Sequence, residues 1–265
     1  MGRHLPIIAL LCLPALAAAD QRPTLSLVID DLGYSNQLGQ AAINLQGDHT
    51  YAIIPGATYS QNLAKFAQQK DKEIILHLPL QASSSLAPPE PNALDETMNE
   101  DQLTQNLYSM LTAFPNIKGI NNHMGSRLTE IDYFMRPIMD SIKSYNPGLY
   151  FLDSRTTALS VAHTEALNSG LDSISRDVFL DNDHSNIESM RLQFNIWLEK
   201  ARDRGSAIAI GHPHASTISF LRDNLPQTRE KFRFISVSKL IDAVYNSEDA
   251  YSWNEDMTQT QSAFD

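Results

Sequence analysis

The sequence has little cysteine, little positive charge and few long apolar runs. Because Cys12 is its single cysteine, the chain cannot form an internal disulfide, and its fold depends on a hydrophobic core. It carries 31 acidic and 20 basic residues, and the net charge of −11 disfavours nucleic acid or an anionic membrane surface as the main partner. These features favour a globular protein that meets a neutral or cationic ligand.

The longest apolar run lies at the N-terminus, at residues 5–16. Arg3 precedes it, and three alanines at residues 17–19 follow it. The run is too short to cross a bilayer comfortably, and the small residues suit a signal peptidase. We therefore predict that residues 1–19 are a cleaved signal peptide and that the mature protein is periplasmic or secreted, without an integral membrane segment. The alternative is a retained N-terminal anchor.

Beyond this segment, short apolar runs alternate with helical patterns, as in a parallel sheet with helical crossovers. The runs that fit buried strands are 24–30, 50–54, 73–78, 117–122, 149–153, 171–175, 207–211 and 232–236. Helical periodicity is clearest at 102–114, 133–145, 186–202 and 237–245, and Thr97 with Glu100 fits a capping box before the first of these helices. The pattern predicts an α/β fold, a single distorted (β/α) barrel of seven or eight parallel strands over residues 20–247. The tail at 248–265 lacks periodicity and is expected to be mobile.

Polar side chains directly follow several of these strands, where a barrel gathers its active site. They are Asp30, Asp31, His77, His123, Asp153, His212 and His214. Because the carboxyl ends of the strands meet at one end of a barrel, we expect these side chains to lie close together. Asp and His supply the oxygen and nitrogen ligands of hydrolytic zinc centres. The pattern predicts a metal-assisted hydrolase.

Each signal also has a simpler interpretation. Asp31 could start a turn with Gly33 while Asp30 caps a backbone group, and His77 alone could be a hydrogen-bonded core residue. The connection at 81–95 is rich in Ser and Pro and has no periodicity, so it is either a wall of the site or a solvated loop without a role. Recurrence of polar residues after separate strands favours function, since unrelated residues would scatter around the sheet.

Taken in this order, the runs resemble the divergent polysaccharide deacetylases, a branch of the carbohydrate deacetylase superfamily. The resemblance covers residues 24–245. Val28-Ile29-Asp30-Asp31 is similar to the first motif of the superfamily, and Glu73-Ile74-Ile75-Leu76-His77 resembles the strand that brings in the second. The run 119–129 lies at the place of the third motif, and the runs that end at Arg155 and His214 lie at the places of the fourth and fifth.

The resemblance implies a metal set of Asp31, His77 and His123. At Gln81 the chain departs from the family pattern, which has a second His there, and His123 is the expected replacement. His214 is the alternative fourth or substitute ligand. Zn²⁺ is the favoured ion because imidazole dominates the set.

The resemblance also implies the catalytic residues and the substrate. Asp30 would be the general base, and His212 or His214 would protonate the leaving amine. Expected substrate contacts are Tyr34, Asn121, Asn122, Arg127, Asp153 and Arg155. The implied reaction is hydrolysis of N-acetyl groups of an envelope or secreted polysaccharide or a peptidoglycan fragment. The alternative, favoured by Gln81, is a glycan-binding or envelope-regulating protein that kept the barrel without turnover.

Overall fold

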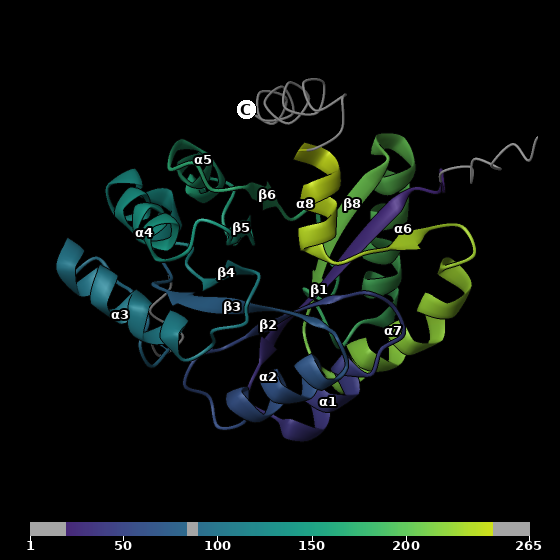
Figure 1. The fold of residues 1–265 in the computed structure, drawn as a ribbon. Helices are drawn as coiled ribbons and strands as arrows, with labels where there is room; N and C mark the ends of the chain where they lie inside the picture. The colour runs from purple at the N-terminus through teal and green to yellow at the C-terminus, as the bar shows by residue number, and fades with distance from the viewer. Residues whose placement is uncertain (1–19, 84–89, 246–265) are drawn as a thin grey trace, which may run out of the picture.

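Parallel strands and helices alternate along the chain in the computed structural model, which describes residues 20–83 and 90–245 (Figure 1). The predicted signal peptide, the middle of the 81–95 connection and the predicted tail at 248–265 lie outside the described residues. The strands are β1 (Thr24–Leu32), β2 (Thr50–Ile53), β3 (Glu73–Leu80), β4 (Gly119–Met124), β5 (Tyr150–Asp153), β6 (Ser173–Ser175), β7 (Val178–Phe179), β8 (Ser206–Gly211) and β9 (Arg233–Phe234). The α-helices are α1 (Asn36–Ile43), α2 (Ser60–Gln69), α3 (Glu100–Thr112), α4 (Asp132–Tyr145), α5 (Ala162–Asn168), α6 (Ile187–Arg204), α7 (Ala215–Thr228) and α8 (Val237–Tyr245), with a 3₁₀ turn, η1 (Leu128–Glu130).

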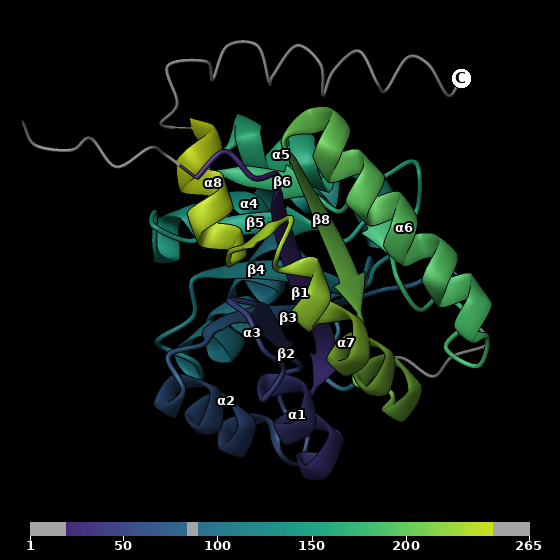
Figure 2. The same cartoon turned by 90° about the vertical axis from the view of Figure 1, so that its right-hand side faces the viewer.

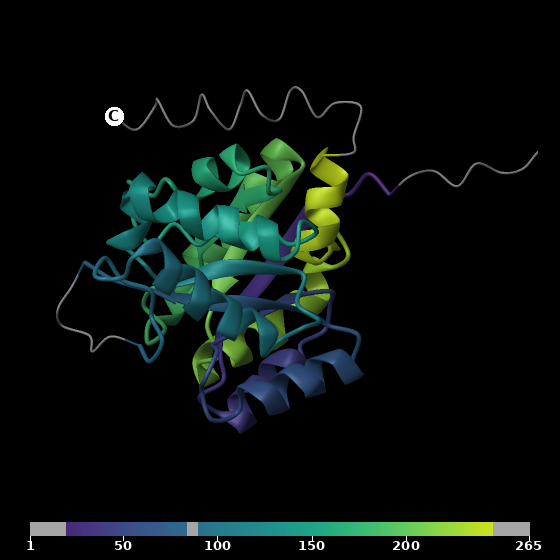
Figure 3. The same cartoon turned by 60° about the vertical axis from the view of Figure 1, so that its left-hand side comes forward.

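The strands form one parallel sheet that curves into a distorted barrel. Its order is β6-β5-β4-β3-β2-β1-β8-β7, with β9 beside the start of β1. The eight strands on this path confirm the predicted barrel, and every predicted strand and helix has a counterpart. Helices cover the outside of the sheet, with α3, α4 and α5 on one side and α6 and α7 on the other (Figures 1 and 2). Figure 3 brings the α3–α5 side forward.

The barrel is closed by a short run of chain that changes its pairing partner in the middle. β6 pairs with β5, and two residues later β7 pairs with β8. At the change, the N–H of Arg176 donates to the carbonyl of Asp153, and the N–H of Asp177 donates to the carbonyl of Ile208, both at 3.0 Å. We call residues 173–179 the closing run. The strand predicted here covers only its first half, because two charged residues interrupt the apolar pattern.

Side chains of the strands alternate between two hydrophobic cores. On β1, Leu27 and Ile29 face the outer helices, whereas Val28 faces the inside of the barrel. The inner core consists of Val28, Ala52, Ile75, Tyr150, Leu152, Ile174, Ile208 and Ile210 from the strands and Val237, Leu240 and Ile241 from α8. Helix α8 therefore plugs the barrel.

Glu73 fixes α8 at the end of the barrel where the strands begin. Its Oε1 accepts hydrogen bonds from Oγ1 of Thr50 at 2.9 Å, from the hydroxyl of Tyr150 at 2.8 Å and from the N–H of Ser238 at 3.2 Å. A carboxylate at the N-terminus of a helix is also favoured by the helix dipole. This buried acid serves the fold, and the plugged end leaves the opposite end for chemistry.

The predicted capping box is wrong by two residues. Asn99, rather than Thr97, caps α3: its side chain accepts from the N–H of Gln102, and the Gln102 side chain accepts from the N–H of Asn99, both at 3.0 Å. Thr97 is already used, because its N–H and hydroxyl both bond to Asp95 in a turn before the helix. Asn99 is therefore the side chain that accepts a hydrogen bond from a backbone N–H group in the first turn of α3.

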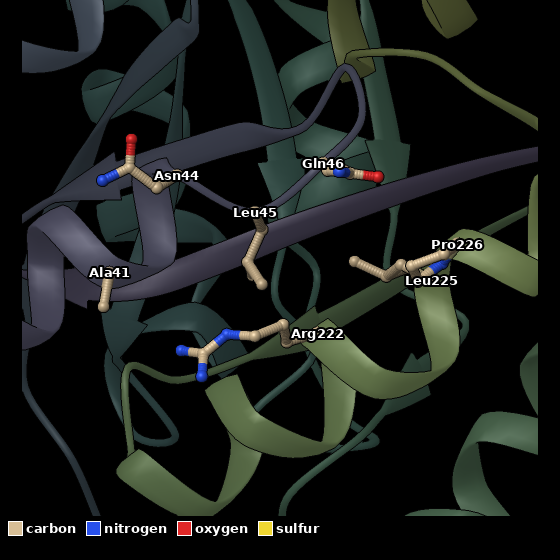
Figure 4. A pocket seen from close by; sticks show the side chains of 7 residues that line it. All are labelled: Ala41, Asn44, Leu45, Gln46, Arg222, Leu225 and Pro226. Carbon is tan, nitrogen blue, oxygen red and sulfur yellow. The ribbon is translucent and has the colours of Figure 1, made fainter.

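A pocket of about 430 Å³ lies outside the barrel, between α1 and α7 (Figure 4). It is lined by Ala41, Asn44, Leu45, Gln46, Arg222, Leu225 and Pro226. Arg222 is the one charged side chain in this lining, which holds no carboxylate, imidazole or thiol. The pocket therefore lacks the groups that hydrolysis requires.

Candidate functional site

Several strands bring predicted site residues to the same mouth of the barrel. On β1, the alternation that buries Val28 in the inner core also turns Asp30, two residues further on, inward. His77, His123 and His212 take corresponding places toward or just beyond the ends of β3, β4 and β8. The site is therefore a polar layer on top of the inner core, as in other β/α barrels.

Asp31 joins this layer because the backbone turns at that residue. Its φ is 57°, in the left-handed region that residues other than Gly rarely adopt. The pairing of β1 with β2 also shifts register between Ile29 and Leu32. Two consecutive carboxylates that would face opposite sides of a regular strand thus both reach the site. Such strain costs on the order of 1–3 kcal/mol and is concentrated at functional positions.

Three ligand atoms, on Asp31, His77 and His123, converge on one point. Nε2 of His77 lies 3.1 Å and Nδ1 of His123 lies 2.9 Å from Oδ1 of Asp31, and the two nitrogens are 3.3 Å apart. A tetrahedral Zn²⁺ with ligands at about 2.0–2.1 Å separates its ligand atoms by about 3.3 Å. Oδ1 of Asp31 is buried without a hydrogen-bond partner that meets normal geometry. The side chains present therefore fit a divalent ion.

Asn121 links this set to Asp30. Its Oδ1 lies 2.7 Å from Nδ1 of His77, so the ring donates there and keeps the lone pair of Nε2 for the ligand cluster. Its Nδ2 donates to Oδ1 of Asp30 at 2.9 Å and to Oγ of Ser154 at 3.2 Å. Asn121 is fully buried with both ends of its amide used. It positions a ligand and a carboxylate, and its contact with substrate stays a prediction.

The two adjacent carboxylates differ in proton affinity. Burial raises the pKa of Asp30, although His77 and His212 oppose the effect. Burial acts in the same direction on Asp31, but the His123 and His77 rings outweigh it and hold the pKa of that carboxyl well below its usual value. Asp31 thus stays ionised, as a ligand must, and Asp30 is the group suited to take up a proton.

His212 is oriented by a buried carboxylate. Its ring Nδ1 lies 2.9 Å from Oδ1 of Asp181, and its backbone N–H donates to Oδ2 of Asp181 at 2.7 Å. Its ring Nε2 points toward Oδ2 of Asp31 at 3.9 Å. Burial lowers the pKa of His212, but Asp181 outweighs burial and raises it to about 9. His212 is therefore held protonated near neutral pH, with Nε2 facing the cluster.

His214 lies apart from the cluster. Its ring stacks on His184, with centroids 3.9 Å apart, and its centroid lies 6.0 Å from that of His212. Within the part of the chain that the structure describes, the group that could hold a metal is Asp31, His77 and His123 without His214. Of the two imidazoles predicted as the acid, the structure brings His212 to the site.

Asp181 is the site residue that sequence reasoning missed. It follows Val178-Phe179-Leu180, which repeats the pattern of an apolar run that ends in a carboxylate. β7 has only two residues, too few for a strand periodicity to stand out. The repeated pattern was the signal that could have found it.

The substitution Asp181→Asn is expected to lower the pKa of His212 toward its ordinary value, because it removes the group that raises it. An acid is active when protonated, a form that is present below its pKa and lost as pH rises through it. The alkaline limb of kcat against pH should therefore move to lower pH, with metal content unchanged. Asp183→Asn is the control, since Asp183 is exposed and bonds only within its own turn. An alkaline limb that stays in place would show that Asp181 does not set the pKa.

Gln81 anchors the 81–95 connection. Its N–H donates to the carbonyl of Leu94 at 2.9 Å, and its own carbonyl accepts from the N–H groups of Arg127 and Leu128. Its side-chain oxygen accepts from the N–H of Glu96 at 2.9 Å. The residue at the place of the expected second His is thus used to hold the connection, and His123 completes the ligand cluster instead.

Two other predicted substrate contacts are buried and bonded to the backbone. Oδ1 of Asn122 accepts from the N–H of Ser154, and Oδ1 of Asp153 accepts from the N–H of Arg155, both at 2.8 Å. Each side chain is at most 2% exposed. Asn122 and Asp153 therefore shape the ends of β4 and β5, and their contact with substrate stays a prediction.

The other predicted contacts are accessible. Tyr34 is 50% exposed, and Arg155 is exposed on a backbone with φ of 47°. Arg127 is also accessible, but it pairs with Glu96 at 3.0 Å. These residues remain predicted substrate contacts.

Known proteins resemble the chain over most of its length. The family model described as divergent polysaccharide deacetylase matches residues 27–241. The uncharacterized protein YibQ of Escherichia coli (strain K12) is 36% identical over 223 residues, which are 83% of this chain and 69% of that protein. An uncharacterized protein of Haemophilus influenzae (strain ATCC 51907 / DSM 11121 / KW20 / Rd) is 33% identical over 216 residues, 82% of this chain and 76% of that protein.

A solved structure shares the fold. The crystal structure of uncharacterized protein ATU2773 from Agrobacterium tumefaciens C58 matches with a TM-score of 0.76 and 22% identity, over 84% of this chain and 91% of that chain. Across residues 20–83 and 90–245, no helix has both the length and the apolar character needed to cross a membrane.

Proposed function

The chain belongs to the divergent polysaccharide deacetylase family, and from this premise we propose that it is a metal-dependent hydrolase that removes N-acetyl groups from a carbohydrate. The observation that carries the proposal is the convergence of Asp31, His77 and His123 beside a carboxylate of raised pKa, Asp30, and a protonated imidazole, His212. A base and an acid next to a Lewis-acid site are what amide hydrolysis requires.

The roles follow from the positions of the side chains. A divalent ion held by Asp31, His77 and His123 would supply Lewis-acid chemistry, which polarises a carbonyl oxygen and acidifies water. Asp30 takes a proton from the attacking water, and Asn121 keeps the carboxylate in place. His212 gives a proton to the amide nitrogen as the carbon–nitrogen bond breaks. The products are an amine on the sugar and acetate.

Zn²⁺ is the proposed ion, because two of the three ligands are imidazoles. The proposed location is the periplasm or the cell exterior, which rests on the signal-peptide pattern of residues 1–19. An acidic protein there would meet a neutral or cationic glycan of the envelope, a peptidoglycan fragment or a secreted polysaccharide. The ring of Tyr34 and the guanidinium of Arg155 are the proposed contacts at the accessible rim.

Acetate release from chitooligosaccharides and peptidoglycan fragments tests the proposal. We expect release by the zinc-loaded protein, loss of release after chelation and recovery when Zn²⁺ is returned. Release that is unaffected by chelation would contradict the metal dependence. Binding of glycans without release of acetate from any of them would favour the second candidate, a glycan-binding protein, for which Gln81 at the expected His position is the supporting observation.

A further inference from the structure

We propose that Glu90 is a positioning residue that holds the ring of His123 for metal binding. The inference rests on the metal set of the proposed function and adds to it a residue from the 81–95 connection. Glu90 would accept a hydrogen bond from Nε2 of His123, which leaves Nδ1 of the same ring free to bind the ion. Carboxylates paired with ligand histidines in this way fix the ring and increase its basicity.

The backbone around Glu90 is fixed by a turn and by pairing with β3. The carbonyl of Glu90 accepts from the N–H of Ala93 at 3.0 Å, and Asn92 between them has φ of 66°. With Pro91 before Asn92, these features are typical of a type II turn, which favours Pro at its second position and Asn or Gly at its third. Leu94 then forms a parallel bridge beside β3 and is fully buried. Glu90 therefore has a defined place near the mouth of the barrel.

Two side chains from separate strand ends meet the carboxylate of Glu90. Oε1 of Glu90 lies 3.7 Å from Nε2 of His123, near the end of β4. Tyr34, just beyond β1, also faces this carboxylate: burial and the neighbouring Glu90 raise the pKa of its hydroxyl.

His123 has a buried ring nitrogen that needs a hydrogen-bond acceptor. Its side chain is only 11% exposed, and Nε2 is buried without a hydrogen-bond partner. A buried ring nitrogen without a partner is costly, at about 1–3 kcal/mol. Its other nitrogen, Nδ1, belongs to the ligand cluster. Among the residues that the structure describes, Glu90 is the carboxylate within ion-pair distance of Nε2, and a shift of less than 1 Å would complete the hydrogen bond. His77 has the same arrangement, since Asn121 partners its non-ligating nitrogen.

The zinc affinity of Glu90 variants of the whole chain tests the inference, measured by competition with a chromogenic chelator. Glu90→Ala should raise the dissociation constant for Zn²⁺ by about 10–100-fold, the usual effect of losing such a partner. Glu90→Gln keeps an acceptor oxygen and should recover most of the affinity. Nitrogen-15 NMR of the His123 ring should place the proton on Nε2 in the natural protein, with Nδ1 unprotonated.

Glu96→Ala is the matched control, because Glu96 directly follows the 81–95 connection and pairs with Arg127 on the surface. It should leave zinc affinity unchanged. An unchanged dissociation constant in Glu90→Ala, or an equal loss in Glu96→Ala, would overturn the inference. A protein whose zinc affinity depends on Glu90 but that releases no acetate would support the inference and overturn the proposed function.

Discussion

The substitution Asp30→Asn is expected to lower kcat by about 10²–10⁴-fold, the range that a positioned general base contributes. Asn has the same shape and its side-chain oxygen can still accept from Nδ2 of Asn121, so the local structure should remain. What is lost is the ability to take up a proton. Because burial raises the pKa of Asp30, its charge is unfavourable to the fold, and the neutral amide should leave the melting temperature unchanged or raise it.

Three measurements on the same preparation separate a lost base from a damaged site: kcat, bound zinc and melting temperature. Asp153→Asn is the matched control, since Asp153 is a buried carboxylate at the end of a nearby strand and bonds to Ser160 and to the backbone. It should reduce stability more than kcat. Activity of Asp30→Asn within tenfold of the natural protein would remove Asp30 from the reaction.

The substitution His77→Ala is expected to abolish both zinc binding and activity, with kcat lowered by about 10³-fold or more, since a Lewis acid supplies several kcal/mol. In the natural protein, zinc at 1,000 times its dissociation constant should add about 4 kcal/mol of stability, and the melting temperature should rise by about 10 °C. This rise should be absent in the variant. His214→Ala, which alters an imidazole outside the ligand cluster, should keep both the rise and the metal.

Zinc binding should also depend on pH in a defined direction. Burial lowers the pKa of His77, but Asp30 and Asp31 outweigh it and raise the pKa above the ordinary value. The ion requires the neutral ring, so a proton must leave and affinity should rise as pH rises through that pKa. Calorimetry in buffers of different ionisation enthalpy measures the released proton. Full metal content in His77→Ala would remove this residue from the set.

Much of the barrel could be predicted because its cause is local. A run such as Ile74-Ile75-Leu76 is apolar at every position, as a strand between a core and a helix layer must be, and the polar residue after it marks the end of burial. The same argument placed Asp30, His77 and His123 together, because parallel strands finish at one end of a barrel. The sequence pattern predicts the structure correctly where one local stretch of chain determines the strand and the place where it ends.

Other features depend on contacts between distant segments. The φ of Asp31, which sends two consecutive carboxylates to one site, cannot be read from Asp-Asp followed by Leu and Gly. Asp181 meets His212 only because β7 and β8 are neighbours, and Asn121 is buried only because His77 and Asp30 bond to its two ends. The polarity of Asn121 indicated a functional role. Its burial depends on tertiary contacts, and so does its role in positioning His77 and Asp30.

The closing run gives the proposed activity an inactivation route that does not require global unfolding. β7 pairs with β8 through only two residues, and Leu180 and Asp181 follow at once. Short edge segments with few backbone hydrogen bonds open at low free energy. Opening there would withdraw Asp181 from His212, while Asp31, His77 and His123 stay on β1, β3 and β4. On mild heating, activity would be lost before metal or helix content is lost. It would recover on cooling, when β7 pairs with β8 again.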